Sequence, residues 1–461
     1  MAAAIQASLP TRLTYETMSE NPQAQPETQN PNLPPIKFEA GGESEPARKA
    51  NLESVLPSPG YPTLAFILAD AIAKRVEMIV FDFSQQSVVV RFKIDGMWHQ
   101  MPMIDRQTGD YMLATAKQLA GMNYRERRAR QEGTFHAEFG GVDYKCVIVS
   151  QGIKTGERVA FTIRHKKLPE VTPEDLGMRP KLKDKAISAM NQEKGLVVIT
   201  SMPGDGFTSS WVTLLGASDR FMRDVVAVED VHNQEPEVIN IRSETYDPQK
   251  HETPVTNIDQ LLLREPDVFV FPEIPNGRVL DRYCDLATKD EKMVITRINA
   301  KHAVDGLFRL MLLKPTIEKL AESLTAIVYH RLIRLLCDNC KQGFAPNPAM
   351  LQRLGIPPGR IANMYTHFQV RPEDAVDENG NPIEIQPCEH CGGLGYHGRT
   401  AIYEVLEIND QIREAMIKNP KLDAIMQIAQ QTGHISLRDE GVVLAAKGVT
   451  SIEELQRVLK K

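Results

Sequence analysis

An apolar run, a glycine-rich turn and a helix start follow one another in GLVVITSMPGDGFTSSW, residues 195–211. This is the order of a P-loop, in which a buried strand leads into backbone amides that surround a phosphate at a helix N-terminus. The lysine of the P-loop consensus is replaced by Phe207. A phenyl ring brings no positive charge to the β- and γ-phosphates, whose charge rearranges during phosphoryl transfer. The segment therefore predicts a nucleotide-binding α/β fold that lacks one part of its chemistry.

The candidate nucleotide-binding residues are those of the turn: Ser201, Gly204, Asp205, Gly206, Phe207 and Thr208. The two glycines let backbone amides turn toward an anion, and Thr208 has the hydroxyl that P-loops use for Mg²⁺. Asp205 adds a negative charge inside the loop, and Ser201 stands where the consensus has glycine. ATP with Mg²⁺ is therefore expected to bind only weakly.

Composition and periodicity divide the 461 residues into several parts, since a chain of this length exceeds one typical core. Residues 14–58 are rich in Pro, Gln, Asn, Glu and Ser, and residues 1–58 are predicted to be a disordered segment or a tether. Residues 59–167 predict a small α+β domain, and the proline-containing 168–181 predicts a linker. In 182–461 helical stretches alternate with apolar strands, which predicts a parallel sheet followed by C-terminal helices over 409–461.

Four of the six cysteines form two CxxC pairs, Cys337 with Cys340 and Cys388 with Cys391. Each pair presents two thiolates on one tight turn, and four thiolates suit tetrahedral zinc with no open position. The alternatives are coincidence or a redox dithiol, and no thioredoxin-like context surrounds either pair. The spacing therefore predicts a structural Cys₄ zinc subdomain over 337–391, in which the metal holds the fold and does no chemistry.

The charge balance argues against a general nucleic-acid or anionic-membrane binder, since 54 Lys and Arg face 60 Asp and Glu, for a net charge of -6. A zinc-dependent nucleic-acid module is a weaker alternative, because residues 388–399 are glycine-rich with little basic clustering. No apolar run approaches the roughly 20 residues of a membrane span. The N-terminus lacks the basic start and apolar core of a signal peptide, so a cytoplasmic protein is expected.

The order of these motifs resembles the type II secretion and type IV pilus assembly ATPases. It comprises the P-loop-like turn, the acidic strand end at 228–230, the Pro-Glu-Ile segment at 272–274 and the paired CxxC. GRTAIYEVLEI (398–408) and GHISLRDEG (433–441) look like C-terminal segments of that family, and the likeness extends over roughly 60–461. The resemblance implies a RecA-like core in a hexameric motor, peripheral at the cytoplasmic face of the inner membrane. There it would act on inner-membrane platform proteins, and its ATP turnover would drive pilin assembly and protein export.

The resemblance assigns catalytic roles unevenly. Glu273 falls on the Walker B glutamate, which is expected to polarise the attacking water, and Glu229 falls on the acidic box. The histidine of the family's histidine box falls on Ile298. Two arginines that family members bring onto the phosphates from the smaller domain fall on Val147 and Thr162. The lost groups all supply or control positive charge around the γ-phosphate, where one arginine can contribute 10³-fold or more in turnover.

A retained scaffold with an eroded site favours a pseudo-ATPase. The sequence thus predicts a component of a secretion or pilus motor, weak in or lacking hydrolysis, within a homo- or hetero-hexameric ring. The alternative is an active ATPase with a rearranged site. In that case Arg297, Lys301 or an arginine from a neighbouring subunit replaces the missing charge, with His302 and Arg164 as further substitutes.

Overall fold

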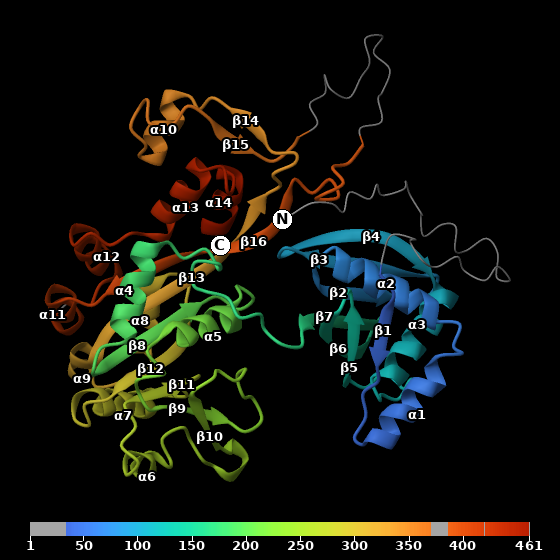
Figure 1. Ribbon diagram of the computed structural model, residues 1–461, viewed down its shortest axis with the longest axis horizontal. Helices are drawn as coiled ribbons and strands as arrows, with labels where there is room; N and C mark the ends of the chain where they lie inside the picture. Colours follow the sequence, from blue (N-terminus) through green and yellow to red (C-terminus); the bar gives the residue numbers. More distant parts are fainter. Residues whose placement is uncertain (1–33, 370–385, 419, 461) are drawn as a thin grey trace. The chain divides into compact units, whose positions relative to one another are not determined.

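The computed structural model describes residues 34–369, 386–418 and 420–460. It divides into two compact units, unit 1 (Met1–Leu168) and unit 2 (Pro169–Lys461) (Figure 1). Among these described residues, no helix combines the length and apolar character needed to cross a bilayer.

Unit 1 is a sheet of seven described strands with three helices, in the order β1-β5-β6-β7-β2-β3-β4 and antiparallel at every pairing. The strands are β1 (Ile36–Glu39), β2 (Val76–Phe83), β3 (Ser87–Ile94), β4 (Met97–Asp105), β5 (Gln131–Phe139), β6 (Val142–Ile153) and β7 (Gly156–His165). The helices are α1 (Glu45–Val55), α2 (Tyr61–Ala73) and α3 (Arg106–Leu119). Alternate residues of β3 are buried, as expected for a strand whose one face packs on helices.

The prediction of disorder is wrong for residues 34–58, which contain β1 and α1. Phe38 of β1 is 6% exposed and packs edge-on against Phe135 of β5, and Val55 of α1 is fully buried. The polar composition of this segment led to the wrong prediction. An edge strand such as β1 needs few apolar residues of its own when it pairs with an existing sheet. The remainder of the predicted disordered segment, 1–33, lies outside the described residues.

The linker prediction is also wrong for most of 168–181. The amide of Ala401 donates to the carbonyl of Leu176 at 2.8 Å, and Met178 is 2% exposed in the core of unit 2. Helix α4 (Pro180–Met190) begins inside the predicted linker, with a proline in its first turn. Proline is favoured at that position because its missing N–H has no intrahelical partner there, so one linker signal was a helix start.

Unit 2 is built on a second seven-stranded sheet, described in the order β10-β9-β11-β12-β8-β13-β16. All its pairings are parallel except that of β13 with β16, which confirms the predicted α/β class with a parallel sheet. The strands are β8 (Gly195–Ser201), β9 (Val225–Asp230), β10 (Ile241–Tyr246), β11 (Val268–Phe271), β12 (Met293–Asn299), β13 (Leu324–Leu336) and β16 (Tyr396–Glu407).

Helices cover both faces of this sheet. Val197 and Ile199 of β8 share a core cluster with α4 and α5 (Phe207–Ala217), whereas Leu196 and Val198 share one with α7 (Gly277–Thr288) and α8 (Ala303–Leu312). Every residue of β8 is buried, as expected for a central parallel strand.

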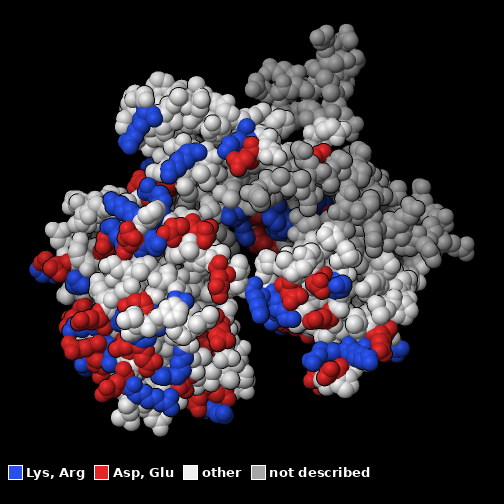
Figure 2. All heavy atoms as spheres, viewed as in Figure 1, with Lys and Arg blue, Asp and Glu red and all other residues white. Residues whose placement is uncertain are grey.

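The other elements of unit 2 are α6 (Ile258–Leu262), α9 (Ile317–Ser323), β14 (Gln342–Phe344), α10 (Pro348–Leu354), β15 (Met364–Thr366), α11 (Asp410–Lys418), α12 (Leu422–Gln431), α13 (Leu437–Ala446) and α14 (Ile452–Leu459). A 3₁₀ turn lies at Pro248–Lys250. The face seen in Figure 2 carries acidic and basic side chains intermixed over the lower part of unit 2.

Candidate functional site

The P-loop-like turn lies at the carboxyl end of β8, where parallel sheets bind ligands. Gly206 caps α5 in the left-handed conformation, with φ of 76°, and a Cβ there would lie 3.2 Å from the Leu332 side chain. No side chain caps the helix, so the amides of its first turn remain available to an anion. The local backbone therefore keeps the features of a phosphate cradle.

Phe207 is held in an aromatic cluster at the start of α5. Its ring centroid lies 5.5 Å from that of Trp211 and 6.2 Å from that of His330. His330 is fully buried, and burial lowers its pKa to about 4, so the ring is neutral near pH 7. The guanidinium of Arg297 lies 4.7 Å from the centre of the Phe207 ring, within cation–π range.

The two candidate catalytic carboxylates are both under the influence of one positive charge, that of Arg297. Glu229 is the penultimate residue of β9 and Glu273 follows β11, and burial raises the pKa of both. The charge of Asp230 raises the pKa of Glu273 further, whereas the charge of Arg297 opposes both shifts. Arg297 therefore contacts Phe207, and its charge also acts on Glu229 and Glu273.

Glu273 is already engaged in this structure. Its carboxylate accepts a hydrogen bond from the hydroxyl of Tyr246, the last residue of β10. The hydroxyl of Tyr283 donates to the Glu273 backbone carbonyl at 3.0 Å. A carboxylate that accepts a hydrogen bond from a phenol has one acceptor position fewer for a water, so Glu273 would have to exchange this partner to orient a water through that oxygen.

Arg297 forms its ion pair with Glu235, a residue that the sequence reasoning missed. The guanidinium and carboxylate lie 2.6 Å apart, with side chains 25% and 11% exposed. Glu235 lies in the connection between β9 and β10. No local pattern distinguishes it from its neighbour Glu237, because only the fold places it opposite β12.

Two other proposed substitutes for the missing charge, Lys301 and His302, make hydrogen bonds at the start of α8. His302 caps α8, its Nδ1 accepting from the amide of Asp305 at 3.1 Å. The backbone amide of Lys301 donates to the carboxylate of the same aspartate at 2.8 Å. Ile298, at the histidine-box position, packs against the core. Among these residues of unit 2, only Arg297 contacts Phe207 through its charged group.

The negative charge of Asp205 is partly offset by arginines. Its carboxylate lies 3.8 Å from the guanidinium of Arg331 on β13. Burial raises the pKa of Asp205, and the charges of Arg331, Arg399 and Arg457 oppose that shift. The loop thus carries less uncompensated negative charge than its sequence suggests.

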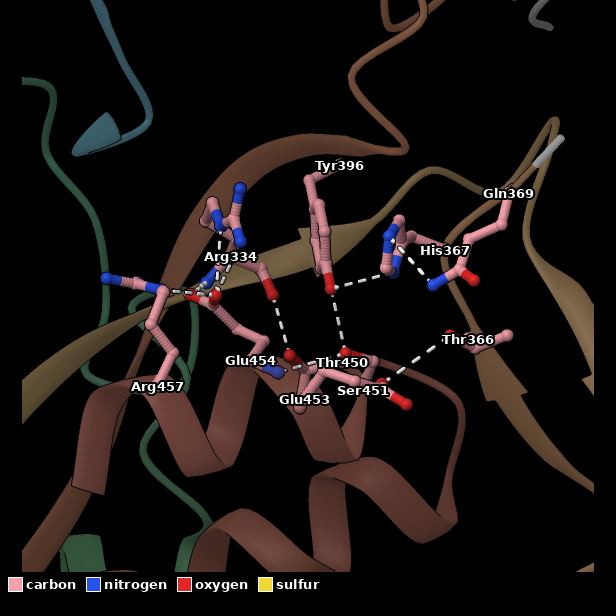
Figure 3. A network of polar contacts seen from close by, with 10 residues as sticks. All are labelled: Arg334, Thr366, His367, Gln369, Tyr396, Thr450, Ser451, Glu453, Glu454 and Arg457. Carbon is pink, nitrogen blue, oxygen red and sulfur yellow. Dashed lines mark hydrogen bonds and ion pairs between the residues drawn. The ribbon is translucent and has the colours of Figure 1, made fainter. Parts of the chain in front are cut away.

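Arg457 belongs to a polar network that joins β13, β16 and α14 (Figure 3). Its centre is the fully buried carboxylate of Glu454, which accepts from the guanidinium groups of Arg334 and Arg457 at 2.6–3.0 Å. Arg334 also lies 3.9 Å above the ring of Tyr396, whose hydroxyl is 2.8 Å from that of Ser451. The network holds the C-terminal helix α14 against the sheet that carries the P-loop.

The structure brings the four predicted zinc ligands together. The sulfurs of Cys337, Cys340, Cys388 and Cys391 all lie within 4.8 Å of one another. Two of the separations are 3.8 Å (Cys337 to Cys388) and 3.7 Å (Cys340 to Cys391). Zinc–sulfur bonds of about 2.3 Å give a tetrahedron with edges of roughly 3.8 Å, so the donor set fits zinc. The Nδ1 of His390 lies 3.4 Å from the Cys337 sulfur.

In unit 1, the two positions at which the family has phosphate-contacting arginines lie on neighbouring strands. Val147 of β6 pairs with Thr162 of β7, and Arg164 lies one strand repeat further along. A separate hollow of about 810 Å³ is lined in part by Arg127, Arg128 and Lys154.

The family model described as "Type II/IV secretion system protein" matches residues 58–457. The type IV pilus assembly ATPase PilB of Thermus thermophilus is 25% identical over 391 residues, which are 84% of this chain and 42% of that protein. Type II secretion system protein E of Pectobacterium carotovorum is 25% identical over 397 residues, which are 86% of this chain and 74% of that protein. The solved Yersinia pseudotuberculosis ATPase DotB has a TM-score of 0.58 at 11% identity, covering 93% of this chain and 98% of that chain. This last likeness shows the fold alone.

Proposed function

Because the chain belongs to the type II/IV secretion system protein family, we propose that it is a component of a type II secretion or type IV pilus assembly motor. Within that machine its RecA-like core binds ATP with Mg²⁺ weakly and hydrolyses ATP close to background. The chain acts as a structural or regulatory subunit of a hexameric ring, homomeric or mixed with an active paralogue. The ring lies at the cytoplasmic face of the inner membrane, against platform proteins.

The observation that carries this proposal is the environment of Phe207. Phe207 stands at the sequence position of the P-loop lysine, and its ring packs against Trp211 and lies 4.7 Å from the guanidinium of Arg297. Turnover requires charge stabilisation on the γ-phosphate and an oriented water. The lysine that would stabilise charge on the γ-phosphate is absent. Orientation of the water depends on Glu273, whose carboxylate accepts a hydrogen bond from the hydroxyl of Tyr246.

Weak binding is supported by the backbone that remains. Gly204 and Gly206 both have positive φ, so the loop can present its amides to phosphate, and Thr208 can supply a hydroxyl to Mg²⁺. The cation would supply charge neutralisation for the phosphates when bound.

We also propose that unit 2 holds one structural zinc ion. The four-sulfur cluster leaves no open position for a catalytic water, and both CxxC turns are tied by backbone hydrogen bonds. The amide of Gly395, for example, donates to the Cys391 sulfur at 3.3 Å, the kind of contact that orients a thiolate ligand.

ATP turnover tests the proposed function. The wild-type chain is expected to hydrolyse ATP at a rate indistinguishable from background, and Phe207→Lys is expected to tighten ATP binding more than it raises turnover. The reason is that a lysine restores one charge, while Ile298 and Val147 still lack the groups of the family. Phe221→Lys is the matched control, since Phe221 is 64% exposed and outside the loop. A wild-type rate of roughly 1 per second, ordinary for an enzyme, would overturn the proposal.

The second candidate is an active ATPase with a rearranged site, favoured by the position of Arg297 over the Phe207 ring. In that case Arg297→Ala should abolish a measurable wild-type turnover, and Phe207→Lys should leave it largely unchanged.

A further inference from the structure

Arg297 is placed where it can take over a task of the missing P-loop lysine. It lies on β12, which pairs directly with the P-loop strand β8 in the register Arg297 opposite Ile199. Its guanidinium reaches across to the first residue of α5, Phe207, at 4.7 Å. The flat guanidinium stacks on the ring, and an ammonium at position 207 would compete for the same space.

In this structure the anion that pairs with Arg297 is a carboxylate of the protein itself, that of Glu235. Glu235 holds the guanidinium at 2.6 Å, and this carboxylate is only 11% exposed. A guanidinium binds carboxylate and phosphate through the same planar arrangement of donors. A nucleotide phosphate and Glu235 would therefore bind Arg297 in mutually exclusive ways.

The surrounding charges make that competition unequal. Arg297 forms its ion pair with Glu235, and its charge also acts on the carboxylates of Glu229 and Glu273. A phosphate that approaches this group meets repulsion unless one carboxylate withdraws. Glu235 is the carboxylate that can withdraw, since it lies in a connection between strands, whereas Glu229 lies within β9 and Glu273 accepts a hydrogen bond from Tyr246.

We propose that Arg297 is the phosphate-binding cation of this site and that Glu235 is an internal competitor, which nucleotide must displace. The inference rests on the proposed nucleotide site, and it adds a regulatory consequence. Displacement frees the connection 231–240 between β9 and β10, so nucleotide occupancy is converted into a loop rearrangement without hydrolysis. A ring subunit built this way reports on nucleotide without consuming it.

The test is binding of Mg²⁺-ADP, measured by calorimetry on the full chain. Glu235→Gln is expected to tighten binding about tenfold, or about 1.4 kcal/mol. Arg297→Met is expected to weaken binding at least as much, and Glu235→Gln should have no effect in the Arg297→Met background. Arg297→Lys should bind with intermediate affinity, because it keeps the charge and loses the planar donors. Glu237→Gln, an exposed carboxylate in the same connection, is the matched control.

A second readout is proteolysis of the 231–240 connection, which saturating Mg²⁺-ADP should accelerate in the wild type. Thermal unfolding of each variant shows whether it is folded.

The outcomes separate this inference from the proposed function. If ADP binds and the Glu235 and Arg297 variants behave like the control, the inference is overturned while weak nucleotide binding stands. If neither the wild type nor Glu235→Gln binds ADP, the inference fails together with the nucleotide site. Rapid ATP hydrolysis by the same wild-type sample overturns the non-hydrolysing function and leaves the role of Arg297 to be judged by the binding data.

Discussion

Glu454→Ala is expected to lower the free energy of unfolding of unit 2 by about 3–5 kcal/mol, because it leaves buried charge without its partner. The Glu454 carboxylate is fully buried and also accepts from the backbone amide of Arg334 at 3.0 Å. Without it, the guanidinium groups of Arg334 and Arg457 lose the anion on which both converge (Figure 3). Urea unfolding measures the effect through Trp211 fluorescence, in a Trp98→Phe background that removes the tryptophan of unit 1.

The adjacent Glu453 provides the control for this prediction. It is exposed, and its carboxylate accepts from the hydroxyl of Thr366 at 3.5 Å, so Glu453→Ala is expected to change stability by no more than about 0.5 kcal/mol. Equal losses for the two variants would contradict the proposed importance of the network.

The network also predicts a pH dependence. Burial raises the pKa of Glu454, but hydrogen bonds from Arg457 and Arg334 outweigh burial and lower it to about 2, from 4.5 in the unfolded chain. The folded state therefore binds this proton less readily than the unfolded state. The stabilisation is complete above about pH 4.5 and is lost as the pH falls toward 2. In Glu454→Ala, that part of the acid sensitivity should be missing.

Loss of zinc is expected to have the other large effect. Pure, reduced protein should contain about one zinc ion per chain, and chelation should lower the unfolding midpoint of unit 2 by roughly 10 °C or more. Binding of structural zinc is coupled to folding, and each kcal/mol moves the midpoint by about 2–4 °C in a unit of this size. Elemental analysis and thermal unfolding, each with and without chelator, provide the measurements.

Cysteine variants separate metal loss from general damage to the core. Cys391→Ser removes a sulfur of the cluster and should abolish stoichiometric zinc. Cys284→Ala changes a buried cysteine of α7 that lies outside the cluster, and it should retain the metal. Reduced wild-type protein without bound metal would rule out the zinc site.

The parallel sheet could be predicted because its evidence is local. β8 is a continuous apolar run followed by glycines, and a fully buried strand needs such a run whatever its neighbours are. The four cysteines were predicted on the same kind of evidence, since each CxxC turn brings its own two sulfurs together. The structure adds that the two turns meet.

Errors arose where a segment is stabilised by distant partners. β1 was assigned to disorder because its composition is polar, yet Phe38 is buried through pairing with β5, about 100 residues away. The segment around Leu176 was assigned to a linker, although its carbonyl accepts from Ala401. Local composition reports how much apolar surface a segment has and does not report which existing sheet or core can cover it.

The sequence by itself determined the class of the fold, the place of the P-loop-like turn and the replacement of the consensus lysine by Phe207, because these depend on residues adjacent in the chain. Only the tertiary structure decided which charges meet at that turn. Arg297 and Glu235 come from separate elements and lie 2.6 Å apart only once β9, β11, β12 and β8 pair side by side. The energy of an electrostatic interaction depends on the distance between the charges in space. The alignment of parallel strand ends sets that distance, and the spacing of the residues along the chain does not.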